Sequence, residues 1–272
     1  MIFQKKINFI KIIEIMETYF SNNMKLQSRI INGNVLKQKQ KKRFNFFGSI
    51  IYKNNKNPCC GGCYIGNNIF ISAAHCLYDI NAHDITIQFN KKNITASGIS
   101  YTVQKIIIHP QFDEKTLNND IAIVYLNGTP SSRGINKLNL PPSPIVNIVN
   151  KVNRTAVIMG YGLVKNKGNS SYYLRMARIK IISRLSKMNK YHSGEITDKM
   201  ILAGNFKKLS NPNDNKDACI GDSGGPMFTN YENRKYLIGL ISWGYQCAKD
   251  GYPGVYTKVS EFVSWIKNST GI

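Results

Sequence analysis

The stretch Gly221-Asp222-Ser223-Gly224-Gly225-Pro226 sets the interpretation of the whole sequence. A serine hydroxyl is a poor nucleophile at neutral pH, so it needs a base to take its proton and donors to stabilise the oxyanion that it forms. Flanking glycines let a substrate carbonyl approach the backbone and leave N–H groups free to bind it. A glycine-rich surface turn is the alternative, but this stretch is long and follows Cys219 and Asp217 closely. A base and an acid elsewhere in the chain would therefore favour the catalytic interpretation.

Two earlier stretches supply these candidates. Residues 72–76 (Ser-Ala-Ala-His-Cys) contain His75 among small residues, after a β-rich run. Residues 118–122 (Asn-Asn-Asp-Ile-Ala) place Asp120 directly before an apolar run, where a buried carboxylate needs hydrogen-bond donors. The Nδ1–H of His75 is one such donor, and this bond fixes the tautomer that leaves Nε2 free to accept a proton.

The order His, Asp, Ser and the flanks of these residues resemble the trypsin/chymotrypsin family of serine endopeptidases. The resemblance runs from Ile30 to about Lys267. It implies a catalytic triad of His75, Asp120 and Ser223. It also implies an oxyanion hole formed by the backbone N–H groups of Gly221 and Ser223.

Short β-rich runs separated by Gly, Asn and Asp occupy both halves of the chain, about six in each half. Pro141-Pro142-Ser143-Pro144 indicates a stiff connector between the halves. The last segment has apolar residues at the spacing of an amphipathic helix, namely Val259, Phe262, Val263 and Ile266. We expect an all-β fold of two six-stranded antiparallel β-barrels with a C-terminal α-helix. The predicted parts are a leader or propeptide (1–29), the N-terminal barrel (30–140), the C-terminal barrel (141–258) and the helix (259–272), with 30–272 forming one peptidase domain.

Composition narrows the classes of partner. Hydrophobic residues make up 42% of the 272 residues, enough for a packed core, and no stretch is apolar enough to predict a transmembrane segment. The formal net charge of +22 indicates a Lys-rich solvated surface, and affinity for anionic polymers or membranes is the alternative. The densest basic run, residues 37–43, lacks interleaved aromatic residues and any nucleic-acid fold signature. We predict no nucleic-acid partner, and a monomer.

Six cysteines, all after residue 58, allow fifteen disulfide pairings in principle. The family resemblance implies the pairs Cys60–Cys76 and Cys219–Cys247. Cys59 and Cys63 are then left over, and free thiols, intermolecular bridges and rearranged pairing all stay open.

A zinc site is the rival interpretation of part of this cysteine set. Cys60, Cys63, His75 and Cys76 are suitable ligand types, but zinc would consume the histidine that the triad needs. The calcium loop of many trypsins needs acids between His75 and His109, an interval with two aspartates and no glutamate. We therefore predict no metal and no cofactor.

The resemblance also implies a substrate pocket with Asp217 at its floor. A carboxylate in a narrow cavity favours a cationic partner, so cleavage after Arg or Lys is predicted. The implied walls and substrate-pairing residues are Ser242, Trp243, Gly244 and Gly254. One departure is Gln246, which stands where trypsins usually have glycine and puts the finer substrate preference in doubt.

Arg29-Ile30-Ile31-Asn32-Gly33 resembles the activation junction of the family. Cleavage after Arg29 would free the amine of Ile30, which could pair with the buried carboxylate of Asp222 and order the oxyanion loop. A flexible basic linker is the alternative. We predict that the protein is a zymogen.

Residues 1–29 form an atypical leader. Their apolar stretch is interrupted by Lys11, Glu14 and Glu17, whereas the core of a secretory signal is uncharged. An amphipathic helix, a truncated leader and a misassigned start site remain open. The family resemblance nevertheless predicts a secreted protein.

The sequence therefore predicts a secreted serine endopeptidase that acts on protein or peptide substrates with Arg or Lys at the cleavage site and can meet protein inhibitors. The first rival is a non-catalytic homologue that binds partners through the same fold. The second rival is a polyanion-binding protein that uses its excess of Lys.

Overall fold

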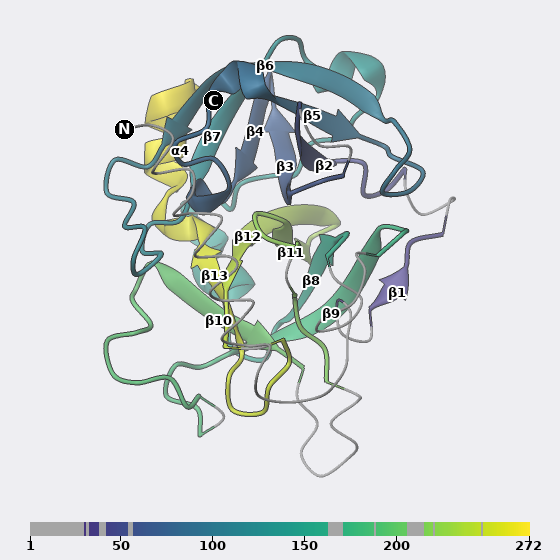
Figure 1. Cartoon of the computed structure of the whole chain (residues 1–272). Helices are drawn as coiled ribbons and strands as arrows, with labels where there is room; N and C mark the ends of the chain where they lie inside the picture. The colour runs from purple at the N-terminus through teal and green to yellow at the C-terminus, as the bar shows by residue number, and fades with distance from the viewer. Residues whose placement is uncertain are drawn as a thin grey trace.

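The computed structural model describes most of the chain after residue 29. The described residues are 30, 33–37, 42–53, 57–162, 171–187, 189–205, 215–219, 221–245 and 247–272. The predicted leader 1–29 with Arg29, the junction residues 31–32 and Gln246 lie outside them. Figure 1 shows two β-barrels, one above the other, with a helix at their side.

The first barrel is closed by the strand order β2-β3-β4-β7-β6-β5, and every pairing in it is antiparallel. Alternating apolar residues build several of its strands: in β5 the apolar side chains are buried and the polar ones half-buried. The strand bounds are β2 Phe47–Tyr52, β3 Cys60–Gly66, β4 Ile69–Ser72, β5 Ile85–Phe89, β6 Ile99–Ile108 and β7 Ala122–Leu126.

The second barrel follows the order β8-β9-β10-β13-β12-β11 and closes through the pairing of β11 with β8. The short strand β1 adds to the outside of this barrel by pairing with β9. The strand bounds are β1 Asn34–Val35, β8 Thr155–Gly160, β9 Arg175–Ile182, β10 Met200–Gly204, β11 Pro226–Tyr231, β12 Arg234–Trp243 and β13 Gly254–Lys258. The predicted fold of two six-stranded antiparallel barrels is confirmed.

Short helical turns fill the links between the strands. They are η1 Ala74–Cys76, η2 Ala82–Asp84, η3 Pro130–Arg133, η4 Ser143–Ile145, α3 Val146–Val149 and η6 Val259–Glu261. The predicted boundary between residues 140 and 141 falls between β7 and β8, beside η4.

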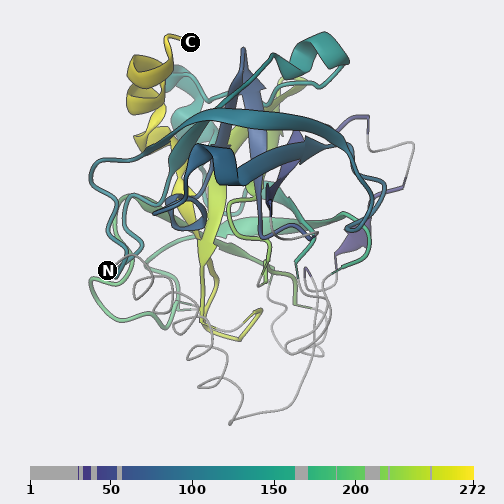
Figure 2. The same ribbon diagram turned by 45° about the horizontal axis from the view of Figure 1, so that its top comes forward.

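The C-terminal helix α4 spans Val263–Thr270 and starts later than the apolar stripe predicted, because residues 259–261 form the tighter turn η6. Of the stripe, Val259, Phe262 and Ile266 are fully buried. The ring of His109 packs edge-on against Phe262 and Trp265, with centroids 5.1 and 4.7 Å apart. The helix is thereby fixed beside the first barrel, as Figures 1 and 2 show.

The largest apolar cluster lies at the seam of the two barrels and holds both in one orientation. The ring of Phe46 from the first barrel stands edge-on to Phe228 of β11, with centroids 5.2 Å apart. Phe47 contacts Tyr161 across the same seam, at 5.9 Å. This packing sets how the two barrels face each other.

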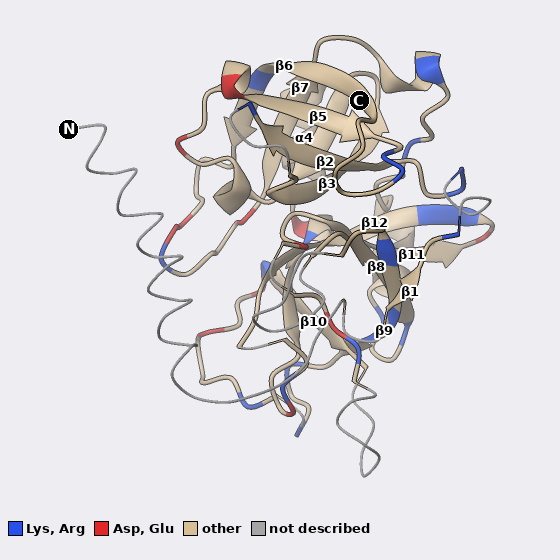
Figure 3. Ribbon diagram, turned by 45° about the vertical axis from the view of Figure 1, so that its right-hand side comes forward, with Lys and Arg blue, Asp and Glu red and all other residues tan. Residues whose placement is uncertain are grey.

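Charge is distributed widely over the surface. Figure 3 shows Lys and Arg residues on both barrels and on the loops, with fewer Asp and Glu. Among the described residues, no helix is long and apolar enough to cross a bilayer.

Candidate active site

Strand pairing brings His75 and Asp120 together. His75 lies in η1, directly after β4, and Asp120 lies just before β7. In the antiparallel pair β4–β7, Ser72 is opposite Ala122. The chain leaving β4 and the chain entering β7 therefore meet at one edge of the first barrel.

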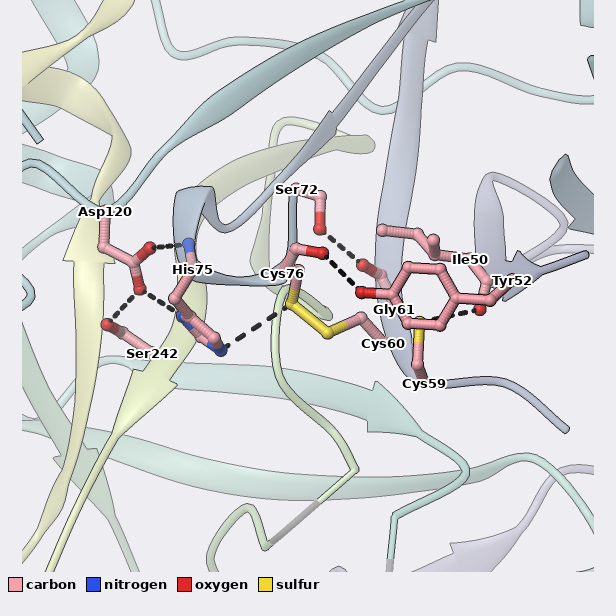
Figure 4. The surroundings of a disulfide bond; sticks show 10 residues. All are labelled: Ile50, Tyr52, Cys59, Cys60, Gly61, Ser72, His75, Cys76, Asp120 and Ser242. Atoms are coloured by element: carbon pink, nitrogen blue, oxygen red, sulfur yellow. Dashed lines mark hydrogen bonds and ion pairs between the residues drawn. A yellow bond between two sulfur atoms is a disulfide. The ribbon is translucent and has the colours of Figure 1, made fainter. Parts of the chain in front are cut away.

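The Asp120 carboxylate accepts three hydrogen bonds there, as Figure 4 shows. Its Oδ2 lies 2.8 Å from Nδ1 of His75 and 2.5 Å from the hydroxyl of Ser242, and its Oδ1 accepts the backbone N–H of His75 at 2.9 Å. The carboxylate is fully buried, so these donors replace water. The bond to Nδ1 fixes the imidazole so that Nε2 is the nitrogen available for proton transfer.

Burial and pairing have opposing effects on the pKa of His75 and on the pKa of Asp120. Burial alone would lower the pKa of His75, but the charge of Asp120 and its hydrogen bond outweigh it and raise that pKa. Burial alone would raise the pKa of Asp120, but the charge of His75 and the three donors hold it below its usual range. The pair therefore favours an ionised carboxylate beside an imidazole that accepts protons readily.

Ser223 is held against the same edge by its backbone. Gly61 of β3 donates its N–H to the Ser223 carbonyl at 2.8 Å. At the next residue, Gly224, an added Cβ would lie 2.2 Å from the hydroxyl of Ser72, three residues before His75. The turn that carries Ser223 in the second barrel thus packs on the strands that lead to His75.

The side chains of Ser223 and His75 are not hydrogen-bonded to each other in the described part of the chain. Nε2 of His75 instead has the disulfide sulfur of Cys76 at 3.6 Å (Figure 4). Hydrogen bonds between a nucleophile and its base are often long before substrate binds. The structure therefore brings the two segments together without forming this bond.

The backbone at Gly221 has a conformation that suits an oxyanion site. Its φ is +89°, which favours glycine because other residues are strained there. Among the described residues, the N–H groups of Gly221 and Ser223 donate to no other group. Two free donors on one turn can bind a developing negative oxygen.

Asp217 lies buried at the side of this turn. Its carboxylate accepts the N–H groups of Ala218 at 2.8 Å and Ala248 at 3.2 Å, and the hydroxyl of Tyr256 at 3.4 Å. An added Cβ at Gly254 would lie 2.4 Å from Oδ1, so glycine is needed to leave the carboxylate open. Burial raises the pKa of Asp217 to about 7, and within the described residues no Lys or Arg pairs with it.

Asp222 is a second buried carboxylate without a cationic partner among the described residues. It accepts the N–H groups of Gly162 at 2.8 Å and Cys219 at 3.0 Å, and burial raises its pKa to about 7. Ile30, the first described residue, is 1% exposed and packs in the apolar cluster of the second barrel with Ile158. The start of the predicted mature chain therefore already lies inside this barrel.

Two disulfides flank the candidate site, Cys60–Cys76 beside His75 and Cys219–Cys247 beside Asp217. Cys59 and Cys63 are free thiols. Burial raises the pKa of Cys59 to about 12 and that of Cys63 further, so neither thiol ionises readily at neutral pH.

One group of described His, Cys, Asp and Glu side chains is close enough to share a metal ion, and it is Cys60, His75 and Cys76. The two sulfurs are joined to each other, so they offer no thiolate to zinc. Cys63, the fourth candidate ligand, lies in the core at the seam of the barrels. These residues do not fit a zinc site.

Sequence reasoning did not single out several contacts of the site. Tyr256 and Ala248 donate to Asp217, and the hydroxyl of Thr257 donates to the backbone carbonyl of Asp120. The backbone of Ser242 is predicted to pair with substrate, and its hydroxyl, for which nothing was predicted, donates to Asp120. No local pattern signals these contacts, because each joins residues more than 30 positions apart.

Comparison with known proteins gives consistent matches. The family model described as Trypsin matches residues 31–266. Trypsin-1 of Astacus astacus is 34% identical over 218 residues, which cover 76% of this chain and 86% of the relative. Trypsin Blo t 3 of Blomia tropicalis is 34% identical and covers 76% of each chain. Transmembrane protease serine 11A of Homo sapiens is 35% identical over 78% of this chain and half of the relative.

Proposed function

Because this chain belongs to the trypsin family of serine proteases, we propose that it is a secreted endopeptidase that cleaves after Arg or Lys. The observation that carries the proposal is the buried Asp120 carboxylate on Nδ1 of His75, on the barrel edge against which the Ser223 turn packs. Substrates are proteins or peptides, with no cofactor and no metal, and the enzyme acts as a monomer.

In the proposed reaction, Nε2 of His75 takes the proton of the Ser223 hydroxyl as Oγ attacks the carbonyl carbon of the substrate. The N–H groups of Gly221 and Ser223 bind the oxygen that becomes negative. His75 then gives its proton to the leaving amine, and an acyl-enzyme remains on Ser223. A water molecule then attacks the acyl carbon while His75 takes one of its protons. His75 passes this proton to Oγ of Ser223 as the ester bond breaks, and the second product leaves as a carboxylic acid.

Asp120 acts on this reaction through His75. Its charge stabilises the imidazolium that forms when His75 holds the proton of Ser223. The hydroxyl of Ser242 donates a hydrogen bond to Oδ2 of Asp120 and keeps the carboxylate oriented.

Substrate selection rests on Asp217. Its carboxylate is buried, accepts hydrogen bonds from neutral donors and has a raised pKa. A cationic side chain that enters the proposed pocket would favour the ionised form of Asp217 and would be bound by its charge. Gly244 and Gly254 leave room for a long side chain, and the backbone of Ser242-Trp243-Gly244 can pair with an extended substrate.

Activation by cleavage after Arg29 follows from Asp222 and Ile30. Cleavage would create an α-ammonium on a residue whose side chain is already buried in the second barrel, and Asp222 is a buried carboxylate that lacks a cation within the described residues. Pairing of the two charges would hold Gly221 and Ser223 in the oxyanion-binding conformation. Arg29 itself fits the proposed specificity, so one active molecule could activate another.

The test is cleavage after Arg29 followed by hydrolysis of Arg, Lys and Phe peptide esters, with a Ser223→Ala protein as control. We expect turnover of the Arg and Lys esters by the cleaved protein and none by the control. A folded, cleaved protein that turns over no ester would leave the non-catalytic homologue as the better description. A preference for Phe would overturn only the role given to Asp217.

A further inference from the structure

Glu195 is an acidic side chain held in one orientation beside the proposed substrate path. Its Oε2 accepts the backbone N–H of His192 at 2.6 Å, and its Oε1 accepts the hydroxyl of Tyr245 at 3.3 Å. Its own N–H donates to the His192 carbonyl at 3.2 Å, which closes a tight turn. Two hydrogen bonds therefore hold the carboxylate, and a third fixes the backbone that carries it.

An aromatic surface lies next to this carboxylate. Tyr245 packs on Tyr191 with ring centroids 5.6 Å apart, and Tyr191 packs on Trp243 at 5.2 Å. Tyr245 also contacts Tyr252 at 5.3 Å and is 41% exposed. Aromatic faces attract cations, so an acid at the edge of an aromatic surface suits a guanidinium or ammonium group.

This surface continues from the pocket of Asp217. Gly254, a wall residue of the proposed pocket, lies against Gly244. A Cβ added to Gly244 would be 3.8 Å from the Cα of Gly254. Tyr245 follows Gly244 directly and donates its N–H to the hydroxyl of Tyr191 at 3.3 Å. A peptide with its basic side chain on Asp217 and its backbone along Trp243-Gly244 would therefore carry its preceding residues past Tyr245.

The charges around Glu195 leave it open to a ligand. Among the described residues, no Lys or Arg lies within ion-pair distance of it. Lys249 lies over the far ring, Tyr252, at 4.8 Å, and Arg184 is paired with Asp198.

We propose that Glu195 and Tyr245 form a second cation-binding subsite, which selects substrates with a further Arg or Lys two or three residues before the cleaved Arg or Lys. This inference rests on the proposed function. It narrows the substrate class from any sequence with one basic residue to sequences with two, spaced along an extended strand.

The test compares kcat/KM for matched peptides that end in the same cleavable Arg and carry either Arg or Ala two, and separately three, residues before it. Exposed ion pairs and cation–π contacts together favour the Arg peptide by about five- to ten-fold in the wild-type enzyme. Glu195→Gln keeps the side-chain shape and removes the charge. We expect it to reduce the Arg-to-Ala ratio about three- to five-fold, and 1 M salt to reduce the wild-type ratio similarly.

Asp198→Asn is the matched control, because it neutralises an exposed acid three residues away on the same segment. It should leave the ratio unchanged. Equal ratios for the wild type and Glu195→Gln at both positions would overturn the subsite while leaving cleavage after Arg intact. Absence of turnover for all peptides by the cleaved wild type would overturn the proposed function instead, so the two failures are distinguishable.

Discussion

Cleavage after Arg29 should change how the stability of this protein depends on pH, and Asp222 sets the size of the change. In the uncleaved chain, burial raises the pKa of Asp222 from 3.8 to about 7. Between these values the folded chain keeps a proton that the unfolded chain releases. The free energy of unfolding therefore falls as pH rises from about 4 to about 7.

The magnitude follows from the shift. A rise of the pKa of Asp222 from 3.8 to about 7 costs about 4 kcal/mol of stability by pH 7. In the cleaved chain, the new ammonium of Ile30 favours the ionised Asp222 and lowers its pKa again, which removes most of this loss. Asp217 has a similar raised pKa, but it is present in both forms and cancels in the comparison.

The assay is urea unfolding at pH 4.5 and pH 7 of the uncleaved and cleaved proteins, both carrying Ser223→Ala to prevent self-digestion. We expect the uncleaved form to lose several kcal/mol more than the cleaved form over this range. Asp222→Asn should abolish the difference, because it removes the titrating group. If both forms lose the same stability without that substitution, the ammonium does not reach Asp222 and the activation proposal is wrong.

Three further predictions concern the catalytic residues and the pocket. Asp217→Ala should reduce kcat/KM for Arg esters by at least about 100-fold, since a buried charge pair of about 3–5 kcal/mol is lost, while Phe esters change little; equal losses for both would contradict the pocket assignment. The acid limb of the pH–rate profile should lie above pH 6.5, because the pKa of His75 is raised and its imidazole loses its proton only at higher pH. Asp120→Asn should move that limb to lower pH, and an unmoved limb would exclude His75 as the titrating base. Ser242→Ala should lower the free energy of unfolding at pH 7 by about 1.5–3 kcal/mol, because the buried Asp120 loses one donor, and a change below 0.5 kcal/mol in urea unfolding would contradict this.

Local patterns in the sequence were sufficient for most of the fold. The β-rich runs predicted about six strands in each half, because strand side chains alternate, as in β5, or form short apolar runs between turn residues, as in β8. β10 carries a weaker signal in the sequence, since all five of its residues are buried and it has no alternation to detect. The helix was predicted four residues too early, because the turn η6 continues the same apolar stripe.

The candidate residues of the site were also named from sequence, through motifs around His75, Asp120 and Ser223. Motifs specify which chemical groups are present and in which order along the chain. They contain no information on distance, so the missing bond between His75 and Ser223, and the donors that Tyr256 and Ala248 give to Asp217, were not predictable.

The sequence by itself determined the residue types, the strand periodicity and, through its motifs, the family. Tertiary structure decided which carboxylates are buried, which of them lack a cation among the described residues and which acid lies beside the proposed substrate path. Burial and pairing depend on residues that are far apart in the chain and become neighbours only when two closed barrels pack together. Asp217, Asp222 and Glu195 are chemically similar in the sequence, and their separate proposed roles arise from these surroundings.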